Sequence, residues 1–219
     1  MPRLLFSKMG EAVWISHLDL MRLFQRAFKR SDLPLTHTQG YNPRPSVSIA
    51  MPLSVGVESV CELLDFELEG EYCSCEEIVA RLNGALVKDV EVLKCYPDGK
   101  KIKELAYLSA TLTLEYDAGI PTNAEAEIRE LFSREMILVE KKGKNGPQEQ
   151  NIAPMIRALD LSVVDEQTLQ IQALVCCQNP SLNPMLLAAA IDRYMPDCKP
   201  DFVRCRREEI FDANNEIFR

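Results

Sequence analysis

Two short stretches of the sequence carry residue types that can bind a ligand or transfer a proton. The first is Ser16-His-Leu-Asp19, where an imidazole and a carboxylate lie two residues apart. Imidazole titrates near neutral pH, so His17 is a candidate general acid or base. Ser16 and Asp19 also have the spacing of a helix N-cap and its acidic partner, which is a structural alternative. On a helix, His17 would lie near the apolar face and Asp19 with the polar face. The sequence therefore assigns no catalytic residue here and keeps His17 as a candidate ligand contact.

The second stretch is the loop Thr38-Gln-Gly-Tyr-Asn-Pro-Arg-Pro-Ser46, which follows His37. Gly40 permits a close backbone approach, and the two prolines stiffen the chain after it. Polar side chains on a stiff loop favour a binding site, although a turn with incidental polar residues is the simpler interpretation. The predicted ligand contacts of this loop are Gln39, Tyr41, Asn42 and Arg44.

The charge of the chain, -8 in total, is unevenly spread. Residues 1–50 hold seven Lys or Arg against three Asp or Glu, whereas residues 51–120 hold six against fourteen. An acidic chain is not a general nucleic-acid coat, but a local basic face can still bind a polyanion. A solvated helix face and an ordinary exposed hairpin are the structural alternatives for these cations. The candidate nucleic-acid contacts are Lys8, Arg22 and Arg26 near the start of the chain, and Lys141, Lys142 and Lys144 in a hairpin that could reach in from the second domain.

The eight cysteines do not have the spacing of a metal site. They form no C-x-x-C pair and no three-cysteine cluster, so we expect free, mostly buried thiols and assign no metal and no cofactor. Nucleotide-binding glycine motifs, H-E-x-x-H and G-x-S-x-G are absent as well. The first residues do not resemble a signal peptide, and no run approaches the ~20 apolar residues of a membrane span. We therefore expect a cytoplasmic protein with reduced thiols that does not act at a membrane.

Hydrophobic periodicity predicts an α+β chain made of two tandem ferredoxin-like units, each with the order β-α-β-β-α-β, the second with an extra hairpin. A polar linker over 98–103 separates a first domain, 1–97, from a second, 104–219. In the first domain, strands are predicted over 3–8, 12–15, 47–51, 63–68 and 90–96, with a helix from Ser16 that Asp32 and Pro34 end and another over 74–86. In the second, strands are predicted over 105–115, 137–142, 148–152, 161–164, 168–175 and 201–210, with helices over 123–132 and 184–194.

The motifs Ser16-His-Leu-Asp-Leu-Met21, Thr38-Gln-Gly-Tyr-Asn-Pro-Arg-Pro45 and Pro52-Leu-Ser-Val-Gly-Val-Glu-Ser59 together resemble the radical SAM-associated (radical SAM-linked) proteins, a bacterial family of unknown function. The resemblance is dense over roughly the first 70 residues and thinner beyond them. Members of that family occur next to, or fused after, a radical SAM protein with a cobalamin-type domain. The resemblance therefore implies a separately encoded partner that contains the iron–sulfur cluster. Where many relatives read Asp-Ile-Arg-Pro, this chain has Asn151-Ile-Ala-Pro154.

Three hypotheses about function follow. The leading one is an accessory or substrate-recognition subunit of the radical SAM enzyme that binds RNA, for example ribosomal or transfer RNA. Tandem ferredoxin-like units also resemble CRISPR repeat endoribonucleases, a likeness of fold alone that makes RNA a sensible anionic ligand. The second is a metal-independent RNA-processing or RNA-modifying enzyme that uses His17 or His37. The third is a protein–protein assembly factor whose basic helix docks an acidic partner.

Overall fold

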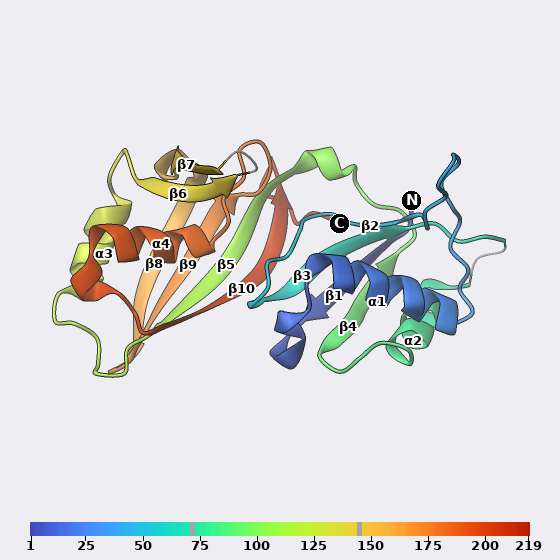
Figure 1. The fold of residues 1–219 in the computed structure, drawn as a ribbon, viewed down its shortest axis with the longest axis horizontal. Helices are drawn as coiled ribbons and strands as arrows, with labels where there is room; N and C mark the ends of the chain where they lie inside the picture. The colour runs from blue at the N-terminus through green and yellow to red at the C-terminus, as the bar shows by residue number, and fades with distance from the viewer. Residues whose placement is uncertain (71–72, 144–145) are drawn as a thin grey trace. The chain divides into compact units, whose positions relative to one another are not determined.

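The computed structural model describes residues 1–70, 73–143 and 146–219, with Lys142 and Gly143 described by their backbone alone. Contacts divide the chain into two compact units, Met1–Glu104 with Phe218–Arg219, and Leu105–Ile217. In each unit, two helices lie over an antiparallel sheet (Figure 1). The α+β class expected from the sequence is thus confirmed. In the part of the chain that the structure describes, no helix has the length and apolar character needed to cross a bilayer.

The sheet of the first unit has the strand order β4-β1-β3-β2, and its neighbouring strands are antiparallel. The short strand β2 follows α1, and α2 connects β3 to β4. The elements of this unit are β1 (Arg3–Lys8), the 3-10 helix η1 (Gly10–Trp14), α1 (His17–Arg30), β2 (Val47–Ile49), β3 (Val57–Phe66), α2 (Cys75–Asn83), β4 (Val90–Tyr96) and the 3-10 helix η2 (Ile102–Glu104).

Apolar residues of α1 pack on the sheet as the helical spacing predicts. Leu20, Phe24, Ala27 and Phe28 are all fully buried, and Met21 is partly buried against the same core. Leu4 and Phe6 of β1, Leu64 and Phe66 of β3, and Ile78 and Leu82 of α2 complete this core. The opposite side of α1 consequently faces solvent, and it carries the basic residues.

Two predicted strands of the first unit differ from the structure. Residues 12–15 do not form a strand, because Gly10 turns the chain at φ +49° and residues 10–14 coil into η1. β3 begins at Val57, six residues before the predicted start. Most of β3 is buried, including the polar Ser59, Glu62 and Asp65. Burial alternates over its first half, but the polar Ser59 takes a buried position and the apolar Val60 a half-buried one. The residue types there therefore do not alternate as they do in a typical half-exposed strand.

The second unit has the sheet order β10-β5-β9-β8 and a separate two-stranded sheet, β6-β7. On β5, the predicted inward residues Leu108, Ala110, Leu112 and Leu114 are all buried. The elements are β5 (Leu105–Glu115), α3 (Ala124–Phe132), β6 (Leu138–Gly143), β7 (Gly146–Asn151), the 3-10 helix η3 (Ala153–Met155), β8 (Ile156–Asp165), β9 (Thr168–Cys176), α4 (Met185–Tyr194), the 3-10 helix η4 (Pro196–Cys198) and β10 (Phe202–Asp212).

Residues Phe218 and Arg219 belong to the first unit, whereas the domain boundary predicted from the sequence assigns them to the second. Phe218 is completely buried, and its ring centroid lies 5.1 Å from the guanidinium carbon of Arg3. The Arg219 guanidinium donates to the hydroxyl of Tyr96 at 3.1 Å. A buried aromatic side chain and a hydrogen bond therefore hold these residues on the first unit.

Candidate functional site

A row of polar and cationic side chains follows one face of α1. Arg22, Gln25, Arg26 and Lys29 are three or four residues apart, so they share this face. Arg22 pairs with Asp19, with 2.8 Å between Nη1 and Oδ1. Among the residues that the structure describes, no carboxylate forms an ion pair with Arg26 or Lys29, and both side chains are exposed. These four residues, which we call the α1 row, present to an anionic ligand two cations that form no ion pair among the described residues.

The residues at the start of α1 form a cap. The Ser16 hydroxyl accepts the backbone N–H of Asp19 at 3.2 Å and donates to Oδ2 of Asp19 at 2.7 Å. These bonds, the one to Ser16 first and the one to Arg22 second, lower the pKa of the Asp19 carboxyl below its usual value. The structural interpretation of Ser16 and Asp19 is confirmed. His17 is partly buried, and its buried Nδ1 has no hydrogen-bond partner among the described residues, so no His17–Asp19 dyad forms through this atom.

The polar loop is closed at its base and exposed at its tip. His37 and Pro45 pair across the base in an isolated bridge, and the N–H of Thr38 donates to the carbonyl of Arg44 at 2.8 Å. The N–H of Arg44 donates in turn to Thr38 Oγ1 at 3.0 Å. Tyr41 is 99% exposed. The four predicted contacts Gln39, Tyr41, Asn42 and Arg44 are all exposed in this loop and available to a ligand, but they do not line the cavity at its base that is described next.

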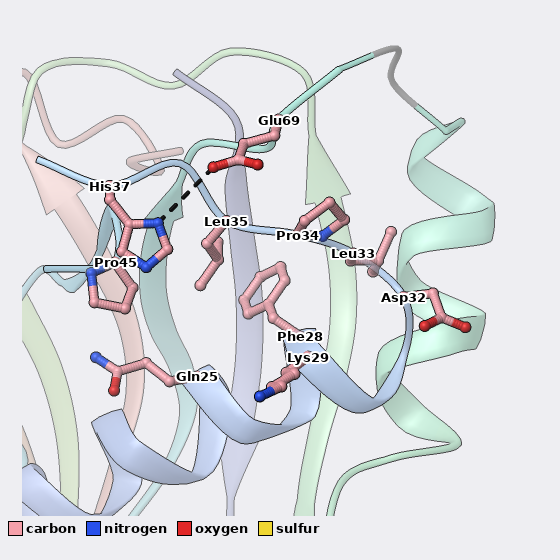
Figure 2. Close-up of a pocket in the computed structure, with 10 residues that line it drawn as sticks. All are labelled: Gln25, Phe28, Lys29, Asp32, Leu33, Pro34, Leu35, His37, Pro45 and Glu69. Atoms are coloured by element: carbon pink, nitrogen blue, oxygen red, sulfur yellow. Dashed lines mark ion pairs between the residues drawn. The ribbon is translucent and has the colours of Figure 1, made fainter. Parts of the chain in front are cut away.

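The base of the loop and the C-terminal half of α1 enclose a cavity of about 630 Å³, which we call the His37 pocket. Gln25 and Lys29 of the α1 row lie at its helix side (Figure 2). On the other side, His37 Nδ1 lies 3.8 Å from Oε1 of Glu69, an ion pair when the imidazole is protonated (Figure 2). The complete lining is Gln25, Phe28, Lys29, Asp32, Leu33, Pro34, Leu35, His37, Pro45 and Glu69.

Backbone hydrogen bonds fix the wall of the His37 pocket opposite α1. Leu35 bridges to Leu68, the N–H of Thr36 donates to the Glu67 carbonyl at 2.9 Å, and the N–H of Glu69 donates to the Pro34 carbonyl at 2.8 Å. The cavity combines an apolar surface with an amide, an ammonium, an imidazole and a carboxylate. Its volume lies within the range of about 300–1,000 Å³ that small-molecule sites occupy. Such a cavity can hold a flat, polar-edged ring.

The structure does not bring the two histidines into one site. Phe28, which lines the His37 pocket, lies eleven positions after His17, so the two are about 16 Å apart along α1 at the helical rise. His17 is not among the lining residues of that pocket.

The prediction that Lys8 contacts nucleic acid is wrong. Lys8 is completely buried, and its ammonium donates to the carbonyl of Val13 at 3.0 Å. Its place in a strand, where every second residue faces inward, and the bulge after Phe6 direct it beneath η1. A basic residue in an alternating strand can also face the core when a carbonyl there accepts its hydrogen bonds.

The basic hairpin of the second unit is described in part. Lys141 is exposed on β6, opposite Gln148. The backbone of Lys142 pairs with Pro147, and Lys144 lies outside the described residues. Their role as nucleic-acid contacts stays a prediction.

All eight cysteines are free, four of them buried and four partly buried. Burial raises the pKa of the Cys95 and Cys205 thiols to about 12, and that of Cys177 and Cys198 to about 11. These four thiols are therefore protonated and poorly nucleophilic at neutral pH. Within residues 1–70, 73–143 and 146–219, no three His, Cys, Asp or Glu side chains group together in a way that could hold a metal ion.

Two features of this site were missed in the sequence. Lys29 and Gln25 share the spacing of Arg22 and Arg26, so the same helical periodicity could have included them in the candidate site. Glu69 reaches His37 only because Leu35 pairs with Leu68, a contact between residues far apart in the chain. No local pattern signals that contact.

Comparison with known proteins gives a family and a fold. The model of a family described as "Uncharacterized protein conserved in bacteria (DUF2344)" matches residues 2–184. A search of curated proteins found no match. Similar solved structures include "Crystal Structure of a Cbf5-Nop10-Gar1 Complex" (8% identity, TM-score 0.52, 95% of this chain and 48% of that chain covered). Another is "Structure of H/ACA RNP bound to a substrate RNA containing 2'-deoxyuridine" (7% identity, TM-score 0.46, 94% and 46% covered). The chain thus spans about half the length of the solved chains that it resembles, and at 8% identity the first likeness concerns the fold alone.

Proposed function

The chain belongs to the DUF2344 family of uncharacterized proteins conserved in bacteria, and from that premise we propose that it is an RNA-binding accessory protein of a separately encoded radical SAM enzyme. The observation that carries the RNA part of the proposal is the α1 row, which leads into the His37 pocket. Arg26 and Lys29 lack carboxylate partners among the described residues, and Lys29 lies at the rim of a cavity with room for a nucleobase.

The chemistry of this surface suits a nucleic acid. Phosphates of a bound strand would lie along the α1 row, where Arg and Lys release the condensed counterions of RNA. A base would enter the His37 pocket against Phe28 and Leu35, with Gln25 and His37 available to its polar edge. Because the whole chain carries a charge of -8, attraction to a polyanion depends on local basic surfaces such as this face.

We further propose that each unit is a ferredoxin-like sandwich and that the fold is duplicated in the chain. Both sheets run fourth, first, third, second when the strands of each unit are numbered in order, with the β6–β7 hairpin left aside. A helix follows the first strand and another follows the third in both units. This is the connectivity that the predicted β-α-β-β-α-β order requires.

The partner part of the proposal rests on the resemblance of the first 70 residues to radical SAM-associated proteins. We expect a complex between this chain and a radical SAM protein to survive purification from the native organism. Affinity capture followed by mass spectrometry checks this, with nucleic acid recovered from the same eluate. Capture without a radical SAM protein would contradict the partnership and leave RNA binding to be judged on its own.

Neutralising the α1 row should weaken RNA binding. For the variant Arg22→Gln/Arg26→Gln/Lys29→Gln, we expect an affinity for transfer RNA or for a single-stranded oligoadenylate lower by roughly 10- to 100-fold at physiological salt, because up to three phosphate contacts are lost. The slope of log affinity against log salt should fall by about two to three. Fluorescence anisotropy of fluorescein-labelled RNA measures both quantities.

A variant of the second unit is the matched control. Lys199→Gln/Arg204→Gln/Arg206→Gln removes the same charge, but each of these cations already has a carboxylate partner, so we expect near-native affinity. Equal losses in the two variants would mean that only net charge matters. If the unmodified protein binds neither RNA, the proposed function is wrong.

The two alternative functions are distinguished in the same experiments. An assembly factor would be favoured if the chain binds no RNA and charge reversal at Arg22 and Arg26 abolishes its complex with the protein partner. An enzyme would be favoured if the protein cleaves or modifies RNA and either His17→Ala or His37→Ala abolishes that activity.

A further inference from the structure

The single tryptophan of the chain, Trp14, is 70% exposed. Leu18, four residues further along the chain in α1, is 66% exposed, and Val55 is 51% exposed. Large aromatic side chains contribute most to stability when they are buried, so an exposed indole contributes little to folding. An exposed ring that is nevertheless held in place is a feature of binding surfaces.

Hydrogen bonds hold the backbone on both sides of Trp14. Trp14 ends η1, and the carbonyl of its neighbour Val13 accepts two hydrogen bonds, from the buried Lys8 ammonium at 3.0 Å and from the N–H of Gly56 at 2.9 Å. At the other end of η1, the N–H of Glu11 donates to Oδ2 of Asp89 at 3.1 Å. Ala12 and Val13 are buried beneath it. The backbone that carries the indole is therefore fixed from both ends.

One side of the indole lies close to the backbone of Gly56. A methyl group at Gly56 would lie 3.7 Å from Cζ3 of Trp14, which is van der Waals contact, and Gly56 has a φ of +81° that favours glycine. Gly56 therefore leaves open the space beside the six-membered ring that a larger residue would fill, and most of the indole is exposed to solvent. The backbone that carries this stacking surface is already ordered before a ligand binds, which lowers the entropic cost of binding.

We propose that Trp14 is a stacking platform for an unpaired base of the RNA that the α1 row holds by its phosphates. The inference rests on the proposed function and names its substrate class, RNA with an accessible single-stranded segment. Leu18, Arg22 and Arg26 follow one another at intervals of four residues along α1, so a strand whose phosphates lie on Arg22 and Arg26 passes beside Leu18 toward Trp14. Base–aromatic stacking beside a basic groove is how single strands are bound without sequence readout.

A nucleobase fits these observations better than a protein partner does. Trp14, Leu18 and Val55 are only three exposed side chains, whereas a stable protein interface needs about 800 Å² on each side. The carboxylates of Glu11 and Asp89 lie at the far end of η1, where Asp89 accepts backbone N–H bonds. The charges beyond Leu18 on α1 are cationic, with Asp19 held by Ser16 and Arg22.

Intrinsic fluorescence tests the platform directly, since only Trp14 emits as a tryptophan. Titration with unlabelled oligoadenylate should quench the emission with the same midpoint that anisotropy gives for labelled oligoadenylate. An oligoadenylate–oligouridylate duplex, whose bases are already stacked on one another, should quench much less. Trp14→Ala should weaken binding of the single strand by roughly 5- to 100-fold, while Trp14→Phe retains most of the affinity. Phe202→Ala, which removes a 54% exposed aromatic ring from the second unit, should change nothing.

The outcomes separate this inference from the proposed function. If anisotropy shows tight RNA binding but tryptophan emission is not quenched and Trp14→Ala keeps the same affinity, the stacking platform is overturned and RNA binding is not. Loss of the protein partner in Trp14→Ala with unchanged RNA affinity also overturns it, and assigns the ring to a protein interface. Absence of any RNA binding overturns both.

Discussion

Replacement of Asp65 by alanine is expected to lower the free energy of unfolding by about 3–5 kcal/mol, because it leaves a buried guanidinium without its counter-charge. Arg3 is 2% exposed, and its Nε and Nη2 donate to the two carboxylate oxygens of Asp65 at 2.6 and 2.9 Å. Its Nη1 is buried and has no partner among the described residues, so the site has no spare acceptor to compensate. A Cβ at Gly99 would lie 2.7 Å from the guanidinium carbon, which leaves the Arg3 head little room to move away.

Urea unfolding measures this loss of stability, and two further variants serve as controls for its cause. Glu77→Ala also removes a carboxylate paired with an arginine, Arg81, but that pair is exposed, so a loss of at most about 0.5 kcal/mol is expected. Arg3→Met/Asp65→Leu replaces both buried charges by apolar groups and should recover much of the stability that Asp65→Ala loses. A loss in Asp65→Ala no larger than that in Glu77→Ala would show that the pair is not the electrostatic anchor described.

Phe24→Ala should cost about 3–5 kcal/mol through the lost apolar burial and the cavity that remains. The ring is fully buried between α1 and the sheet, and it meets Phe6 edge to face, with 4.7 Å between centroids and 63° between planes. Because Phe24 lies on the buried side of the helix that carries the α1 row, RNA affinity should also fall at temperatures where the variant begins to unfold. Thermal and urea unfolding followed by circular dichroism measure the stability.

Leu18→Ala is the matched control on the same helix. Leu18 is 66% exposed, so its removal should change the stability by no more than about 0.5 kcal/mol. Equal destabilisation by the two substitutions would contradict the assignment of the inward and outward faces of α1.

Local patterns predicted the elements whose partners are close in sequence. The capping residue Ser16, the apolar face of α1 and the alternation along β5 follow from spacing alone, and the structure has all of them. The sequence does not predict the first half of β3, because the buried Ser59 interrupts its apolar pattern and accepts the N–H of Cys61 in the same strand. Register between distant segments decides whether a polar residue lies inside, and a single sequence does not contain that information.

The same reason explains which site residues were predicted. The exposed loop 39–44 and the cations of α1 were recognised by composition and helical spacing. Lys8 was misjudged, and Trp14 was not singled out, because the exposure of each depends on η1 and on how Gly56 approaches it. The carbonyl of Val13 accepts hydrogen bonds from both the buried Lys8 ammonium and the N–H of Gly56, contacts that no local pattern signals.

Placement of Phe218 and Arg219 on the first unit has a consequence for the order of folding during synthesis. A ribosome makes the whole of residues 105–217 before it reaches Phe218, so the first unit must wait, with the ring above Arg3 missing, until the second unit has been translated. Domains that are contiguous in sequence can fold one after another from the N-terminus, but this chain cannot complete its first unit in that way. The nascent first unit is therefore incomplete for the time that translation of more than a hundred residues takes, and this interval is when a chaperone would have most to protect.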